Sequence, residues 1–191
     1  MSPTGASRII FDPTRKSHAD MDTIKQLIRD IPDFPKPGIL FKDLTPLLRD
    51  PSALRLCAEL LSAPFSKLNI TAVMGMEARG FIFGTLVAQQ LGVGFVPLRK
   101  PGKLPAAIFT EDYALEYGSA TLAMHQDALA PHDRVLIVDD LLATGGTADA
   151  SVRLARRAGA QVVGCSFVVE LDFLSGREAL DVKKIHSLVH F

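Results

Sequence analysis

Residues 135–148 read VLIVDDLLATGGTA, and this stretch decides the fold class of the chain. Apolar residues run directly into two adjacent carboxylates, Asp139 and Asp140, and a loop of small and hydroxyl-bearing residues follows. The apolar run predicts a buried strand, and the residues from Thr147 onward predict a helix. A strand, a glycine-containing loop and a helix in this order form the repeating unit of α/β proteins with a parallel sheet.

The loop between this strand and helix has the composition of an anion site. Gly145 and Gly146 leave the backbone free to curl with its N–H groups inward, and Thr144 and Thr147 add hydroxyl donors. The helix N-terminus adds partial positive charge. Because ligands of open α/β sheets bind beyond the carboxyl ends of the strands, we expect a phosphate monoester here. The Walker A lysine and the G-x-G-x-x-G pattern are both missing, which argues against nucleotide hydrolases and dinucleotide-binding proteins.

The two carboxylates narrow the ligand further. Asp139 and Asp140 can accept hydrogen bonds from ribose hydroxyls and can hold hydrated Mg²⁺ through its water shell. The expected ligand is therefore a ribose 5-phosphate that carries further phosphate. The alternative is that the aspartates only cap a helix and that the glycines only form a turn.

The rest of the chain extends this unit into a parallel sheet with helices on both faces. Apolar patterns predict further strands at 71–76, 94–100, 161–171 and 186–191, and helices at 22–31, 51–63, 77–92 and 147–160. Residues 101–118 predict a long loop that returns through a strand at 113–118, with which residues 120–129 can pair.

Composition bounds the class of protein. The chain has 191 residues, of which 48% are hydrophobic, and its formal net charge is zero. These values are typical of one soluble domain and give no sign of general affinity for nucleic acid or membranes. Without a signal-peptide core we expect a cytoplasmic protein, with Cys57 and Cys165 as buried thiols. The five histidines show no metal-ligand spacing.

The stretch at 135–147 closely resembles the phosphoribosyl pyrophosphate motif of the type I phosphoribosyltransferases, in the form found in members that act on adenine. Further segments match that family in its order: FPKPGILFKDLTPLL (34–48), GMEARGFIFG (75–84), LRKPGKLP (98–105) and LEYG (115–118). The resemblance implies a central parallel sheet flanked by helices, with a small hood and a flexible lid loop. It implies a single domain at 22–191, with a base-binding hood segment at 22–45, a lid loop at 101–118 and a flexible N-terminal extension at 1–21.

The resemblance also implies an activity. The chain would transfer 5-phosphoribosyl from 5-phosphoribosyl 1-diphosphate (PRPP), with Mg²⁺, to N9 of adenine, giving AMP and diphosphate. A homodimer is implied, with no nucleic-acid or membrane partner. Two alternatives stay open: a transferase for xanthine or another purine, and a non-catalytic PRPP-sensing regulator. The regulator would need a DNA- or RNA-binding element, and a chain with a formal net charge of zero gives no support for one.

Site residues carried over by resemblance fall into four groups. Those expected to bind PRPP are Asp139, Asp140, Ala143, Thr144, Gly145, Gly146, Thr147, Glu77, Ala78, Arg99, Lys100 and Lys103. Those expected to bind adenine are Ile39, Phe41, Lys42 and Leu141, the first and third through their main chain. Arg79 and Glu116 are the expected catalytic residues, and Tyr117 would cover the ring as part of the lid. The Glu77–Ala78 peptide bond would be cis.

At three positions this sequence differs from the residue found in many relatives. Ala78 stands where the family often has Ser, so any hydroxyl contact from that position is absent. Lys42 stands where relatives often have Arg, which is tolerable if only the backbone contacts the base. Relatives that act on 6-oxopurines usually place Asp at the position of Ala143 to handle base protonation, so here that task would fall to Glu116.

Overall fold

The computed structural model describes residues 18–114 and 119–191. Its centre is a five-stranded, fully parallel sheet, as the alternation of apolar strands and helices predicted. The strand order is β4 (Gly94–Leu98), β3 (Ala72–Met76), β7 (Arg134–Leu142), β8 (Gln161–Glu170) and β9 (Ile185–His190). Thus β3 and β7, the strands that precede the two expected phosphate-binding loops, lie side by side.

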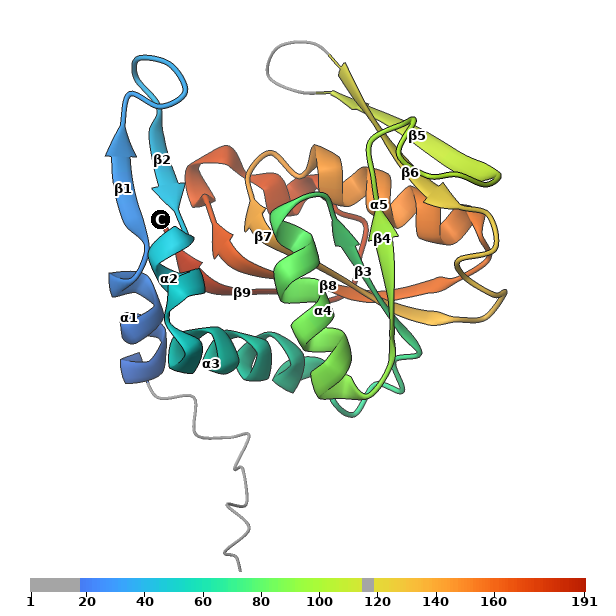
Figure 1. Ribbon diagram of the computed structural model, residues 1–191, viewed down its shortest axis with the longest axis horizontal. Helices are drawn as coiled ribbons and strands as arrows, with labels where there is room; N and C mark the ends of the chain where they lie inside the picture. Colours follow the sequence, from blue (N-terminus) through green and yellow to red (C-terminus); the bar gives the residue numbers. More distant parts are fainter. Residues whose placement is uncertain (1–17, 115–118) are drawn as a thin grey trace, which may run out of the picture.

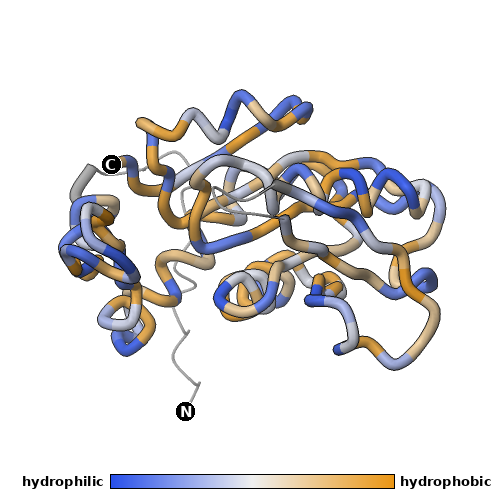
Figure 2. Tube along the Cα trace, turned by 90° about the horizontal axis from the view of Figure 1, so that it is seen from above, coloured by the Kyte–Doolittle hydropathy of each residue, from blue (hydrophilic) through white to orange (hydrophobic). Residues whose placement is uncertain are grey.

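Each face of the sheet has its own hydrophobic core, because successive strand residues point to opposite faces. Val73 of β3 packs with Phe83 of α4 (Arg79–Leu91) and Leu61 of α3 (Pro51–Ser62) on one face. Met74, the next residue along β3, packs with Val152 of α5 (Gly146–Arg157) on the other. Because both faces are covered, every residue of β3 is buried, and Figure 2 shows hydrophobic runs along many segments of the chain. In the part of the chain that the structure describes, no helix is long and apolar enough to cross a membrane.

Two antiparallel hairpins flank the sheet and rise from the same edge (Figure 1). The hood hairpin pairs β1 (Arg29–Pro32) with β2 (Leu40–Asp43), and α2 (Thr45–Arg49) follows it. The second hairpin pairs β5 (Ile108–Ala114) with β6 (Ser119–His125). A hairpin is present here, as predicted, but its first strand is Ile108–Ala114, five residues earlier than the predicted start at residue 113, and residues 115–118 of the predicted strand lie outside the described residues.

The predicted helix at 22–31 is wrong at both ends. Helix α1 runs over His18–Gln26, so Asp22 lies inside it and residues 18–21 are helical rather than part of an extension. Residues 29–32 form β1 because they pair with β2, and the pairing is reinforced by cross-strand ion pairs from Arg29 to Asp43 and from Lys42 to Asp30. Long-range pairing here overrides the local helical pattern.

Three short 3₁₀ segments complete the described chain: η1 (Ala63–Phe65), η2 (Asp172–Leu174) and η3 (Gly176–Ala179). The last two connect β8 to β9 on the carboxyl side of the sheet. The other predicted elements agree with the structure within a few residues, including the end of α4 at Gly92, which has a φ of 71°. That left-handed conformation is the usual reason for glycine after a helix.

Candidate active site

The loop over residues 143–147 follows β7 and leads into the first turn of α5. Gly145 has a φ of 85°, and a Cβ there would lie 2.4 Å from the carbonyl oxygen of Gly176. Glycine is therefore required by conformation and by space. Residues 139 and 141–148 line a small cavity of about 70 Å³ at this turn. The α5 N-terminus and two threonines border this cavity, and such an arrangement has the chemistry to bind an anion.

The two aspartates precede this loop and differ in their surroundings. Asp140 is 5% exposed, and Arg79 Nε donates a short hydrogen bond to its Oδ2. Asp139 Oδ1 accepts a hydrogen bond of 2.9 Å from the main-chain N–H of Asp140. Burial, together with the neighbouring Asp140 carboxylate, raises the pKa of Asp139 well above its usual range. One carboxylate is thus paired with a cation, while the other is held in an unfavourable field.

Gly80 allows α4 to approach these aspartates. A Cβ at Gly80 would lie 2.5 Å from Asp139 Oδ1, so only glycine lets the first turn of α4 pack against that carboxylate. Sequence reasoning missed Gly80 as a site residue. Its signal was its place directly after Arg79, at the start of a helix that follows a buried strand.

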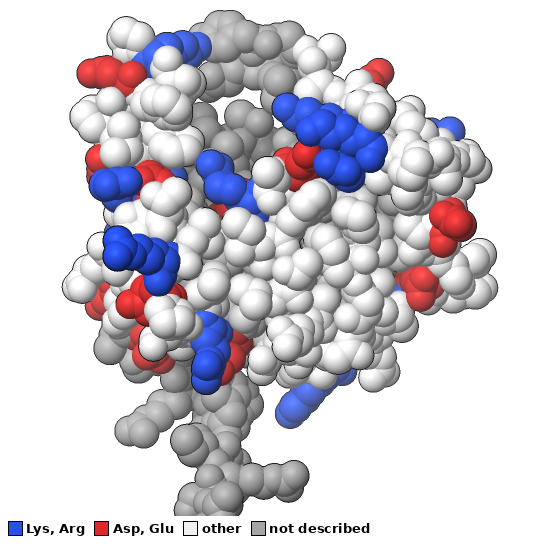
Figure 3. All heavy atoms as spheres, viewed as in Figure 1, with Lys and Arg blue, Asp and Glu red and all other residues white. Residues whose placement is uncertain are grey.

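The loop after β3 carries charge. The Glu77–Ala78 peptide bond is cis, as expected. Arg99 Nε donates to Glu77 Oε2 at 3.2 Å, and Lys103 Nζ donates to Glu77 Oε1 at 2.9 Å. These hydrogen bonds lower the pKa of Glu77 to about 2. Figure 3 shows basic side chains gathered around acidic ones at the upper edge of the molecule, beside a hollow.

Of the expected base-binding residues, Ile39, Phe41 and Lys42 lie on the hood hairpin, and Leu141 lies near the end of β7. The guanidinium of Arg79 lies 5.5 Å from the ring centroid of Phe41, so this ring faces the aspartate pair. Lys42, the next residue, turns to the opposite side of the hairpin. Its Nζ donates to Asp30 at 2.7 Å and lies 3.7 Å from the ring centroid of the C-terminal Phe191. The N–H and carbonyl of Ile39 are both engaged within the hood turn, although its carbonyl keeps a second lone pair.

The chain is similar to known proteins over most of its length. A family model described as phosphoribosyl transferase domain matches residues 44–187. An adenine phosphoribosyltransferase of Methylococcus capsulatus is 64% identical over 90% of this chain and 100% of its own length. The chain belongs to the adenine phosphoribosyltransferase family.

Solved structures of adenine phosphoribosyltransferases share the fold. The enzyme of Rhodothermus marinus has a TM-score of 0.87 and 52% identity, covering 92% of this chain and 100% of that one. The Saccharomyces cerevisiae enzyme, solved in complex with adenine and D-2,5-dideoxy-2,5-imino-altritol 1,6-bisphosphate, has a TM-score of 0.85 and 38% identity. It covers 89% of this chain and 98% of its own. The fold predicted from the sequence is thereby confirmed.

Among the expected adenine phosphoribosyltransferase site residues, two groups come together through direct contacts. Arg79 joins Asp140 and Phe41, and Glu77 joins Arg99 and Lys103. Lys100 contacts Glu77 through its main-chain N–H, whose nitrogen lies 3.4 Å from Glu77 Oε2, and the residue is exposed. Glu116 and Tyr117 lie outside the described residues, so their placement stays a prediction.

Sequence reasoning also missed a polar cluster on the carboxyl side of β8. In the described ranges, one group has three metal-type ligand atoms mutually within 4.8 Å, and it consists of Glu170, Asp172 and His190. Their spacing in the sequence follows no metal motif, because β9 brings His190 back beside β8.

Proposed function

We propose that this protein transfers the 5-phosphoribosyl group of PRPP to N9 of adenine, giving AMP and diphosphate. One observation carries the proposal: the Asp139–Asp140 pair lies between a backbone-built anion loop and Arg79, which also faces the aromatic ring of Phe41. Phosphate, ribose, pyrophosphate and base groups therefore have adjoining binding positions. The names of the relatives, which are adenine phosphoribosyltransferases, support the choice of base.

In this proposal residues 143–147 bind the 5′-phosphate and the aspartates accept hydrogen bonds from the ribose hydroxyls. The bond from C1′ to the pyrophosphate breaks with oxocarbenium character, and negative charge grows on the leaving group. Arg79, Arg99 and Lys103 then stabilise that charge, since guanidinium and ammonium groups bind phosphate oxygens strongly. The protein contributes chiefly position and electrostatic stabilisation.

Mg²⁺ fits the carboxylates at this edge. Asp139 and Asp140 offer oxygen ligands, the type that Mg²⁺ prefers, and carboxylates commonly hold this ion through its retained waters. The raised pKa of Asp139 indicates that added positive charge nearby is favourable. When bound with PRPP, the ion would supply charge neutralisation to the pyrophosphate.

The base and lid complete the proposal. Phe41 and Leu141 would enclose the adenine ring, and main-chain groups of Ile39 and Lys42 would read its amine and N1. The Phe41 ring lies beside Arg79, whereas the Lys42 side chain is buried against Asp30 and Phe191 on the other side of the hairpin, which supports a backbone role for Lys42. Glu116 would manage the proton redistribution of the base, with Tyr117 covering the ring. We also propose a cytoplasmic homodimer in which the exposed segment 99–103 extends toward the second subunit.

The test is a purine panel with PRPP and Mg²⁺, following diphosphate release by the wild type and by Glu116→Ala. We expect turnover with adenine and a loss of about 100-fold in kcat for the variant, within the usual range for a general acid or base. Asp127→Ala, an exposed carboxylate beyond the far end of β6, is the matched control and should retain wild-type rates.

Each contrary outcome has a distinct meaning. Turnover with xanthine or hypoxanthine in place of adenine would keep the phosphate sites and overturn the assigned base. Binding of PRPP without turnover on any purine would overturn the enzyme assignment in favour of a ligand sensor.

A further inference from the structure

The loop over residues 143–147 packs against the connection that follows β8. Glu170, the last residue of β8, pairs in register with Leu142, where that loop begins. A Cβ at Gly176 would lie 2.0 Å from the carbonyl oxygen of Ala143, and a Cβ at Gly145 would lie 2.4 Å from that of Gly176. The backbones of the two segments are therefore in direct contact. Any displacement of Gly176 would displace the loop.

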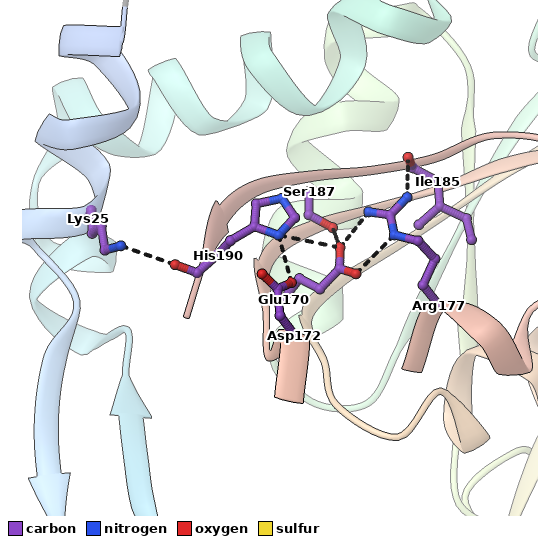
Figure 4. A network of polar contacts seen from close by, with 7 residues as sticks. All are labelled: Lys25, Glu170, Asp172, Arg177, Ile185, Ser187 and His190. Carbon is purple, nitrogen blue, oxygen red and sulfur yellow. Dashed lines mark hydrogen bonds and ion pairs between the residues drawn. The ribbon is translucent and has the colours of Figure 1, made fainter. Parts of the chain in front are cut away.

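An ion pair joins the two ends of the connection between β8 and Gly176. Arg177, next to Gly176, donates from Nη2 to Glu170 Oε2 at 2.6 Å and from Nε to Oε1 at 3.0 Å. Its Nη1 donates to the carbonyl of Ile185 on β9 at 3.0 Å. Figure 4 shows the guanidinium between the Glu170 carboxylate and that carbonyl. Two-point pairing of this kind fixes orientation as well as distance.

The Glu170 carboxylate is built into the sheet edge rather than lying on the surface. It is 5% exposed and also accepts a hydrogen bond of 2.5 Å from Ser187 Oγ. Burial opposes ionisation, but the hydrogen bonds from Arg177 and Ser187 outweigh it and lower the pKa of Glu170. Removing Arg177 would leave a buried carboxylate without its cation, which is unfavourable.

A cation site explains this cluster less well. Asp172 and His190 lie near Glu170, with His190 Nδ1 at 2.8 Å from Asp172 Oδ1. Both Glu170 oxygens, however, already accept hydrogen bonds from Arg177, whose positive charge would repel a metal ion. The geometry is that of a structural clamp.

We propose that the Glu170–Arg177 pair is a positioning device, which holds Gly176 against residues 143–147 and so keeps that loop in its phosphate-binding conformation. This inference rests on the proposed function, because it takes the loop as the site of the 5′-phosphate. A shift of about 1 Å in a positioning group can reduce catalysis by about 100-fold, so an indirect support can have a large effect. Arg177 and Glu170 themselves touch no substrate in this proposal.

The test compares Arg177→Met and Arg177→Lys with the wild type by calorimetric titration with ribose 5-phosphate and, separately, with pyrophosphate. For Arg177→Met we expect ribose 5-phosphate binding to weaken about 10-fold, with pyrophosphate affinity unchanged within about twofold. Steady-state kinetics should show a matching rise in KM for PRPP, with KM for adenine unchanged. Arg177→Lys keeps the charge without the two-point geometry, and should weaken ribose 5-phosphate binding about threefold.

Two controls separate positioning from general destabilisation. Ser187→Ala removes another hydrogen bond to the same carboxylate but leaves the connection closed, and should bind ribose 5-phosphate as the wild type does. Asp181→Asn breaks the Arg156–Asp181 ion pair, whose nitrogen and oxygen lie 3.0 Å apart, and should do likewise.

Equal weakening of ribose 5-phosphate and pyrophosphate binding, or no change for folded Arg177→Met and Arg177→Lys, would overturn the inference. If Arg177→Met does not fold, Arg177→Lys alone decides, with its melting temperature recorded. Failure of the wild type to turn over adenine would overturn the proposed function instead, so the two failures are distinguishable.

Discussion

The loops after β7 and β3 face the same edge of the sheet, and under the proposed function they would hold phosphate in different ways. The loop at 143–147 has no charged side chain, and its shape is fixed by the left-handed Gly145 and by contact with Gly176. The loop after β3 depends on cations that are already engaged by carboxylates: Arg79 by Asp140, and Arg99 and Lys103 by Glu77. The first loop is preorganised, whereas the second must exchange partners when its ligand binds.

This difference suits the proposed reaction. The 5′-phosphate stays attached to the sugar throughout, so a rigid backbone cradle serves both substrate and product. The pyrophosphate must be bound, stabilised as a leaving group and then released. Carboxylates that compete for the same cations keep them from binding pyrophosphate too tightly, while leaving no cation without a partner.

The largest effect should come from distorting the rigid loop. Gly145→Ala places a Cβ against the Gly176 carbonyl and in a left-handed conformation, so the loop must shift. We expect kcat/KM for PRPP to fall by about 100-fold or more. Gly92→Ala is the matched control, since Gly92 also has a positive φ but nothing within 4 Å of its added Cβ. It should lower stability by about 1 kcal/mol and leave kcat/KM unchanged.

A similar loss in both glycine variants would mean that general destabilisation by a left-handed alanine, rather than contact between residue 145 and Gly176, causes the loss of activity. The melting temperatures of the two variants, measured with and without PRPP, separate these cases. Only Gly145→Ala should lose the stabilisation that the ligand provides.

A smaller effect on kcat/KM is expected from replacing Asp139, which lies between the two loops. The folded protein raises the pKa of Asp139, so its proton is held more tightly in the folded than in the unfolded state. The contribution of Asp139 to the free energy of unfolding is fully present below its pKa in the unfolded state, and it is lost as the pH rises through its pKa in the folded state. At neutral pH Asp139→Asn should therefore raise the ligand-free melting temperature by roughly 2–4 °C, the effect of about 1 kcal/mol, while kcat/KM falls about 10-fold or more.

The melting temperatures of the two proteins should converge as the pH falls below the ordinary Asp pKa of 3.8, where Asp139 binds its proton in both states. Asp127→Asn, at an exposed position, is the control and should change neither quantity. A lower melting temperature for Asp139→Asn at neutral pH would contradict the unfavourable field assigned to this carboxylate.

The sequence predicted one of these loops better than the other, and the reason is physical. The shape of residues 143–147 depends on local chemistry, glycine freedom and a helix N-terminus, all of which are visible in a short stretch. The contacts of Glu77 depend on residues 22 and 26 positions away, brought near by the parallel pairing of β3 with β4. The residue types of the loop after β3 could be predicted from the sequence, but the ion pairs between them could not.

The same distinction explains the other misses. Strand β1 was predicted as helix because its partner β2 lies beyond a proline-rich turn, and periodicity in a short window cannot reveal that partner. Gly80 and Gly176 are required by close approach between segments far apart in sequence, to Asp139 and to Ala143. A glycine needed for a turn is visible in the local sequence, but the segment that a glycine needed for packing approaches is not.

The smallest effect should come from removing the competing carboxylate of the loop after β3. Glu77→Gln keeps the size of the side chain but removes the charge that holds Arg99 and Lys103. We expect the inhibition constant of pyrophosphate to fall about threefold, as the release of partly exposed ion pairs allows. Because the pKa of Glu77 is about 2, the carboxylate is ionised throughout pH 5–9 and the effect should not vary with pH there. It should shrink at high salt, since screening weakens both competitors.

Asp181→Asn, which removes the exposed side-chain ion pair with Arg156 remote from the loop after β3, should leave the pyrophosphate constant unchanged. The direction of the Glu77→Gln effect decides the comparison between the loops. Tighter pyrophosphate means that Glu77 competes with the ligand and that this loop works by exchange. Weaker pyrophosphate means that Glu77 aligns Arg99 and Lys103 for the ligand, and the loop after β3 is then preorganised by charge just as residues 143–147 are by backbone.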